Sequence, residues 1–205
     1  MLILGLTGSI GMGKSRAARA FRRLGVPVFD ADQMVHRLME RGGGAVSSVE
    51  RAFPSTVREG AVDRVALGAR VFGKSDELRR LERILHPRVR AACARFLKRA
   101  RARRDAMVVL DIPLLLETGG DANCDYTAVV TAPHFVQRAR VLARRGMTEE
   151  KFAAVLTQQM PDAEKRRRAD FVIPTGNSFR YSFDVIRDIV LLLTGVCPAP
   201  TQDLR

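Results

Sequence analysis

The residues with the clearest chemical meaning stand near the start of the chain, where Gly8 to Ser15 read G-S-I-G-M-G-K-S. This segment matches G-x-x-x-x-G-K-[ST], the pattern of a phosphate-binding loop. In such a loop, successive backbone N–H groups and the N-terminus of the following helix surround an anion. We therefore predict that the phosphates of ATP are bound by Gly8, Gly11, Met12, Gly13, Lys14, Ser15 and Arg16.

Two side chains of this loop have separate tasks. Lys14 is expected to bridge the β- and γ-phosphates, and the Ser15 hydroxyl is expected to ligate Mg²⁺. The alternative is an ordinary Gly-rich turn with an exposed lysine, which the apolar run before the loop and the helical pattern after it disfavour. A dinucleotide-binding G-x-G-x-x-G fingerprint is excluded, because Arg16 stands where the third glycine would be.

Carboxylates at two predicted strand ends are candidates for handling the reacting groups. Asp32 closely follows the apolar run 26–29, so it is expected to accept the proton of an acceptor hydroxyl or to orient it. The alternative is that Asp30 or Asp32 caps the following helix. Asp111 ends the run 107–110 as a Walker B acid does, and is expected to hold Mg²⁺ directly or through water. The alternative there is a strand-terminal turn residue.

Three basic side chains are further candidates. Arg140 and Arg144 are four residues apart in a helical pattern, so they project from one face and could clamp the transferring phosphate as a closing lid does. A solvated helix face is the alternative. His86 precedes Pro87, where a histidine serves equally as a helix cap, a core hydrogen-bonding residue or a ligand contact.

Short apolar runs alternate with helical patterns along the chain. This alternation predicts an α/β fold of the P-loop type, a doubly wound, mostly five-stranded parallel sheet with right-handed crossovers. Ligands of such sheets bind at the carboxyl ends of the strands, where Asp32, Asp111 and the phosphate loop are expected to converge. The predicted strands are 2–6, 26–29, 107–111, 126–131 and 171–173.

The helical patterns divide the chain into a core and an insertion. We expect a core of residues 1–32 and 105–205 and an all-helical insertion over about 33–104, with a helical lid over about 138–165. Within the insertion, Asp63 is expected to cap one helix and His86-Pro87 to start another. The other predicted helices are 16–24, 33–40, 133–145, 148–160 and 179–193, followed by a loose tail from Val196 with Pro198 and Pro200.

Composition limits the partners. A net charge of +13 suggests nucleic acid as a candidate partner. The arginines, however, are spread along the chain and lack the interleaved aromatic residues of a protein that binds single strands. The three cysteines, Cys93, Cys124 and Cys197, lack metal or redox spacing and indicate a reducing, cytoplasmic compartment. No apolar run reaches membrane-spanning length. We expect no nucleic-acid or membrane partner, and a monomer or small homo-oligomer.

Taken in order, the motifs resemble those of the dephospho-coenzyme A kinase family. The similarity spans residues 2–173. Beyond the phosphate loop, it rests on Asp30-Ala31-Asp32, Gly60-x-x-Asp63-Arg64, Leu85-His86-Pro87, Ile112 to Glu117, Gln137-x-x-Arg140-x-x-x-Arg144, Gln159 and Ala169 to Ile173.

The resemblance implies transfer of the ATP γ-phosphate to the 3′-hydroxyl of dephospho-coenzyme A, with Mg²⁺ as cofactor, in the last step of coenzyme A biosynthesis. It implies that Asp32 is the base and that the helical insertion receives the acceptor with His86 at its edge. It also places Arg140 and Arg144 in the lid, beside Lys14 in the catalytic set. The crevice between the lobes is implied to contain Pro113, Leu114 and Leu115.

The chain departs from the family pattern at several positions. Arg16 replaces the usual threonine after the loop serine, which is tolerable because Ser15 already supplies a metal-binding hydroxyl. Thr175 lies near a position commonly held by asparagine beside the adenine, so recognition of the adenine of ATP is expected to differ from that in the family. Pro54 replaces a glycine, and Leu116 replaces a frequent phenylalanine.

Two other functions remain open from the sequence. One is a different small-metabolite P-loop kinase, acting on a nucleoside monophosphate or a sugar acid; a monophosphate acceptor would need a second phosphate clamp in the inserted lobe. The other is a basic, ATP-regulated nucleic-acid binder. The latter draws only on the charge, and it predicts binding with a steep dependence on salt concentration.

Overall fold

The chain forms two compact units in the computed structural model, which describes residues 1–196. The first unit combines residues 1–29 with the chain from residue 100 onward, and the second comprises residues 30–99. The tail predicted from Val196 lies outside the described residues apart from Val196 itself, as does Cys197.

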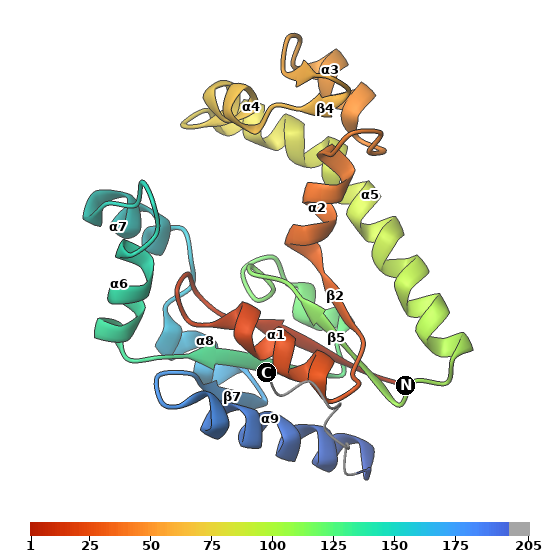
Figure 1. The fold of residues 1–205 in the computed structure, drawn as a ribbon, viewed down its shortest axis with the longest axis vertical. Coiled ribbons are helices and arrows are strands. Elements are labelled where there is room, and N and C mark those ends of the chain that lie inside the picture. Colours follow the sequence, from red (N-terminus) through yellow and green to blue (C-terminus); the bar gives the residue numbers. More distant parts are fainter. Residues whose placement is uncertain (197–205) are drawn as a thin grey trace. The chain divides into compact units, whose positions relative to one another are not determined.

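A five-stranded sheet forms the centre of the first unit, in the order β2-β5-β1-β6-β7 (Figure 1). β1 pairs in parallel with β5 and β6, and β6 pairs in parallel with β7, so the predicted parallel α/β sheet is confirmed. In register, Leu4 of β1 lies between Val109 and Tyr126. The strands are β1 (Leu2–Thr7), β2 (Val28–Asp30), β5 (Met107–Asp111), β6 (Tyr126–Thr131) and β7 (Phe171–Pro174).

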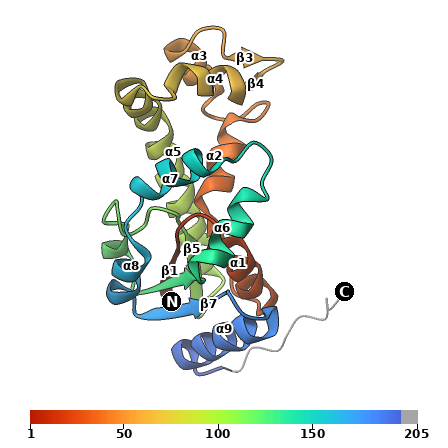
Figure 2. The same ribbon diagram turned by 90° about the vertical axis from the view of Figure 1, so that its left-hand side faces the viewer.

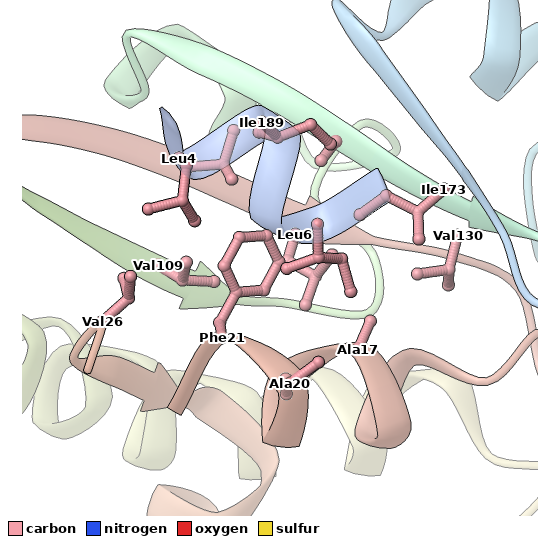
Figure 3. Packing of buried hydrophobic residues seen from close by; sticks show 14 of the residues in the cluster. Leu4, Leu6, Ala17, Ala20, Phe21, Val26, Val109, Val130, Ile173 and Ile189 are labelled. Carbon is pink, nitrogen blue, oxygen red and sulfur yellow. The ribbon is translucent and has the colours of Figure 1, made fainter. Parts of the chain in front are cut away.

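Two helices, α1 (Lys14–Arg23) and α9 (Phe179–Thr194), cover one face of this sheet. The buried residues of α1 include Ala17, Ala20 and Phe21, a helical spacing that gives the helix one apolar side. Figure 3 shows the Phe21 ring among Leu4, Leu6 and the side chains that α9 contributes. α9 also packs along β7 (Figure 2). This core fixes the end of β1, from which the phosphate loop leaves.

The remaining helices of the first unit follow β5, β6 and the loops between them. The helix expected over 133–145 ends earlier, at Leu142, and Gly146 separates it from the next one, as predicted. An ion pair between Arg138 and Glu149 joins these two helices. The elements are η1 (Gly120–Asn123), α6 (His134–Leu142), α7 (Glu149–Thr157) and α8 (Asp162–Arg168).

The second unit is not entirely helical, so that prediction was wrong. A two-stranded antiparallel hairpin joins β3 (Val57–Arg58) to β4 (Ala61–Val62). Its turn consists of Glu59 and Gly60, both with positive φ, which is the conformation of a tight two-residue hairpin loop. Strands of two residues are too short to show an alternating pattern. The helices around it are α2 (Ala31–Met39), α3 (Val46–Ala52) and α4 (Arg64–Val71), the last capped by Asp63 as predicted.

The longest helix, α5 (Ser75–Ala102), contains Pro87 in its interior, so the predicted helix start at His86-Pro87 was also wrong. Leu81 and Leu85 are buried in the core of the second unit and hold the helix before the proline. After it, the Arg88 guanidinium donates hydrogen bonds to the Ile84 carbonyl at 2.6 Å and to Ser48. Packing therefore outweighs the lost backbone hydrogen bond. Among residues 1–196, no helix is both long and apolar enough to cross a membrane.

Candidate active site

The predicted phosphate loop leaves the carboxyl end of β1 and enters α1 at Lys14. Gly11 and Gly13 have φ of +76° and +90°, which turn the backbone into a concave path. In the part of the chain that the structure describes, the amides of Gly11, Gly13, Lys14 and Ser15 donate to no other protein group. With the N-terminal end of the α1 dipole, these amides form a site suited to an anion.

Lys14 and Asp111 meet at the mouth of this loop. The Lys14 Nζ lies 2.6 Å from Asp111 Oδ1, and the two side chains are 15% and 1% exposed. The contact follows from the sheet order, because β5 neighbours β1 and Asp111 lies in register with Leu6. Two residues that are 97 positions apart in the sequence are thereby joined.

Arg140 of α6 lies beside the loop. Its guanidinium donates to the Thr175 carbonyl at 2.6 Å and to the Thr175 hydroxyl at 3.1 Å, and reaches the Gly11 carbonyl at 3.4 Å. The Thr175 hydroxyl in turn donates to the Met12 carbonyl at 2.6 Å. Burial, and then the neighbouring charge of Arg16, lower the pKa of Arg140. A cation held at this point is available to phosphate oxygens at the loop.

Arg144 is placed differently. It lies beyond the last residue of α6, in an exposed turn, so it does not share a helix face with Arg140 as predicted. The helix ends at Leu142, and the turn that follows it ends at Gly146, with φ of +77°, before α7. Of the two arginines predicted to belong to a lid, only Arg140 contacts the phosphate loop within the described residues.

Arg16 also differs from a simple loop residue. Its guanidinium lies over the Phe179 ring, 5.3 Å from the centroid, in a cation–π contact. Arg16, Phe179 and Thr175 contribute to the lining of one surface hollow next to α1. Met12 points the other way, since its side chain is buried and its sulfur accepts a hydrogen bond from the Ala132 amide.

Asp30, the last residue of β2, and Asp32, in the first turn of α2, have different surroundings. Asp30 accepts a hydrogen bond from the Gln33 amide at 2.8 Å and is the N-cap of α2. Asp32 is exposed in the first turn of that helix and takes no part in the cap. The cap alternative therefore applies to Asp30 and not to Asp32. His86, also in the second unit, is exposed on α5, where it lines a hollow with Arg79, Arg83 and Arg90.

The segment after Asp111 contains the residues predicted to contact the acceptor. Leu114 is exposed and Pro113 is half-buried, and the Pro113 carbonyl accepts a hydrogen bond from the Thr7 hydroxyl at 2.8 Å. Leu115 is fully buried against Gly5, so its side chain is a core contact of β1. Of these three residues, only Pro113 and Leu114 therefore have side-chain surface that an acceptor could contact.

The predicted metal ligands, Ser15 and Asp111, supply one hydroxyl and one carboxylate. Mg²⁺ in nucleotide sites keeps several waters and binds one or two carboxylates together with phosphate oxygens. Among the described residues, no group of three or more His, Cys, Asp or Glu side chains could hold a metal ion. The donor set thus fits Mg²⁺ that arrives with a nucleotide, and it does not fit a metal held by protein ligands alone.

Sequence reasoning missed the role of Lys165. The basic run Glu164 to Arg168 is typical of a solvated helix face, but Lys165 is fully buried and forms a 2.7 Å ion pair with Glu117. Burial would raise the pKa of Glu117, but the interactions with Lys165 and with the Met160 amide lower it below its usual value. Because three arginines follow Lys165, the run looks uniformly exposed, and the sequence does not indicate that this lysine is buried.

Gly11 offers a test of the loop's packing. A Cβ at Gly11 would lie 2.5 Å from the Val141 Cγ2 and 3.0 Å from the Gln137 carbonyl oxygen. We expect Gly11→Ala to weaken ATP binding and to lower the free energy of unfolding by about 1–2 kcal/mol of backbone strain plus a further 1–3 kcal/mol of overpacking.

The matched control for this substitution is Gly25→Ala, because Gly25 has a similar φ of +75° but no atom within 4 Å of the position that an added Cβ would take. It should cost the strain alone and leave ATP affinity unchanged. Urea denaturation and calorimetric titration with ATP would check both variants. Equal losses in the two would show that Gly11 is not tightly packed.

Comparison with known proteins shows similarity to dephospho-CoA kinases along most of the chain. The family model for dephospho-CoA kinase matches residues 2–180. The dephospho-CoA kinase of Paramagnetospirillum magneticum is 60% identical over 199 residues, which cover 97% of this chain and 94% of that protein. A crystal structure of a Thermus thermophilus protein is 37% identical, with a TM-score of 0.79, covering 93% and 96% of the two chains. The dephospho-CoA kinase from Campylobacter jejuni, 23% identical over 95% and 98%, shares the fold with a TM-score of 0.67.

Proposed function

The chain belongs to the dephospho-CoA kinase family, and from this we propose how its own residues transfer the ATP γ-phosphate to the 3′-hydroxyl of dephospho-coenzyme A. The products are coenzyme A and ADP. The observation that carries the assignment of the ATP site is the Lys14–Asp111 contact at 2.6 Å beside the amides of the phosphate loop.

Charge neutralisation is the main task of the site in phosphoryl transfer. We assign the β- and γ-phosphates to the loop amides and to Lys14, and the transferring group to Arg140. Mg²⁺, held by Ser15 and Asp111 together with phosphate oxygens and water, would supply further positive charge there. The nucleotide base is proposed to lie near Thr175, outside the small hollow that Thr175 lines with Arg16 and Phe179, because that hollow has room for no more than about one water molecule.

Asp32 is proposed as the group that accepts the proton of the 3′-hydroxyl when its oxygen attacks the γ-phosphorus and the bond to the ADP oxygen breaks. Its exposed carboxylate, unlike that of Asp30, is not used in capping α2. The acceptor is assigned to the second unit, with His86, and to Pro113 and Leu114. Residues of about 138–165 are proposed to close as a lid, with Arg144 in the exposed turn that follows α6.

The test is ADP release by the purified protein with ATP, Mg²⁺ and dephospho-coenzyme A, beside adenosine monophosphate, gluconate and shikimate. Turnover confined to dephospho-coenzyme A is expected, with coenzyme A identified as product. Excess EDTA should abolish it, and added Mg²⁺ should restore it. Turnover with another acceptor would overturn the substrate assignment, and activity in EDTA would overturn the metal assignment.

The turnover experiment also decides whether the alternative of a nucleic-acid binder needs to be tested. If all four acceptors gave no turnover, salt-dependent binding to DNA or RNA would be measured next, since a nucleic-acid binder loses affinity steeply as salt rises. We expect no such binding at moderate ionic strength.

The reducing conditions indicated by the cysteines suit a cytoplasmic reaction, and neither Cys93 nor Cys124 forms a disulfide among the residues that the structure describes.

A further inference from the structure

Two consecutive residues at the end of the lid are anchored to different parts of the first unit. The Gln159 Oε1 accepts a hydrogen bond from the Ile10 amide of the phosphate loop at 3.0 Å. The next amide, that of Met160, donates to Glu117 Oε1, also at 3.0 Å. A shift of this segment would therefore act on the phosphate loop directly.

A buried ion pair holds Glu117 in turn. Lys165 is fully buried, and its Nζ lies 2.7 Å from Glu117 Oε1, the same oxygen that accepts from Met160. Burying an ammonium and a carboxylate is costly, and such a pair adds little net stability compared with apolar residues of similar volume. Within residues 1–196, Glu117 Oε2 and Lys165 Nζ are buried without a well-formed hydrogen bond. A contribution to the free energy of unfolding therefore does not by itself explain why the chain has this ion pair.

A second side chain holds Ile10 from the other side. The Gln137 Nε2 donates to the Ile10 carbonyl at 2.8 Å, and Gln137 is buried. Because each peptide unit is planar, the direction of the Ile10 carbonyl fixes the direction of the Gly11 N–H. In the same way, the Gln159 contact fixes the peptide unit between Ser9 and Ile10. Two successive peptide planes of the loop are therefore set by glutamine side chains from outside it.

We propose that Gln137 and Gln159 are positioning residues of the phosphate loop, and that the buried Glu117–Lys165 pair acts on the loop through Gln159. The chain of contacts runs from Lys165 to Glu117, to the Met160 amide, and through Gln159 to Ile10. None of these side chains is required to touch the nucleotide. Their effect is to aim the Gly11 amide before ATP arrives, and the proposal rests on the ATP site assigned above.

The first test compares Gln159→Met with Gln158→Met, which alters the exposed neighbour. Losing one hydrogen bond that orients the loop should raise the Kd for ATP about 5- to 10-fold. Hydrogen exchange of the Ile10 amide should accelerate in the same variant, while Gln158→Met should resemble the wild type in both measurements. Unchanged ATP affinity and Ile10 exchange in Gln159→Met would overturn the proposal. A wild-type protein that bound no ATP would instead overturn the proposed function.

The second test asks whether the ion pair acts through Gln159. Glu117→Gln/Lys165→Met removes both charges and keeps an acceptor for the Met160 amide, so the variant is expected to fold. Its Kd for ATP should rise, because the side chain at position 117 is no longer anchored by an ion pair and therefore holds Met160, and with it Gln159, less firmly. Adding Gln159→Met should then give no more loss than Gln159→Met alone, within about twofold, since coupled residues are not additive. Multiplied losses, or an unchanged Kd in the pair variant, would overturn the role of the pair.

Discussion

Replacing Lys14 with methionine is expected to lower kcat/KM by a factor on the order of 10³, because the site loses the cation that neutralises the β- and γ-phosphates. The same change should lower the free energy of unfolding by about 3 kcal/mol, since Asp111 is 1% exposed and loses its 2.6 Å ion pair. Steady-state kinetics and urea denaturation would measure the two effects separately.

The control for Lys14→Met is the double variant Lys14→Met/Asp111→Asn. A neutral amide at position 111 needs no ammonium partner, so most of the lost stability should return. Activity should not return, because neither the lysine nor the carboxylate is restored. Recovery of activity in the double variant, or near-normal activity in the single one, would contradict the assignment of the phosphate loop.

Replacing Asp32 with asparagine is expected to lower kcat by a factor on the order of 10² or more, with the Kd for ATP unchanged. Asparagine keeps the size of the side chain but cannot accept the proton of the acceptor hydroxyl, and general-base catalysis is worth about that factor. Because Asp32 takes no part in the cap of α2, folding should be unaffected. Turnover assays and calorimetric titration with ATP would check both expectations.

Asp30→Asn is the matched control two residues away. Asparagine caps a helix as well as aspartate does, and Asp30 serves α2 through its hydrogen bond with the Gln33 amide. Turnover near that of the wild type is expected. If Asp30→Asn lost activity and Asp32→Asn kept it, the two carboxylates would exchange roles, and the proposed base would be wrong.

The sheet and the phosphate loop were predictable because their signals are local. Each core strand is a short apolar run, and the loop motif specifies its glycines, lysine and serine at fixed spacing. The observed strand Met107–Asp111 has the predicted bounds, and so has Tyr126–Thr131. From these, the meeting of Lys14 with Asp111 follows once the order of the strands is known.

The errors came from features that depend on distant residues. Pro87 reads as a helix start, but the packing of Leu81 and Leu85 carries α5 through it. Lys165 reads as one more surface charge, and only the position of Glu117, far earlier in the sequence, makes it a buried partner. Gln159 belongs to the motifs of the family resemblance, but nothing in its local sequence predicts its contact with Ile10, 149 positions away.

The order of strands in the sheet also bears on how the protein is made. β1 leaves the ribosome well before its two neighbours in the sheet, β5 and β6, whose residues begin at Met107 and Tyr126. At about 5–20 residues per second, the intervening chain takes about 5–25 s to synthesise. Over that interval the apolar strand Leu2–Thr7 has no sheet partner, and such distant pairings form slowly even in the complete chain. The strand that leads into the phosphate loop is thus paired on both sides only after the chain has been made as far as β6.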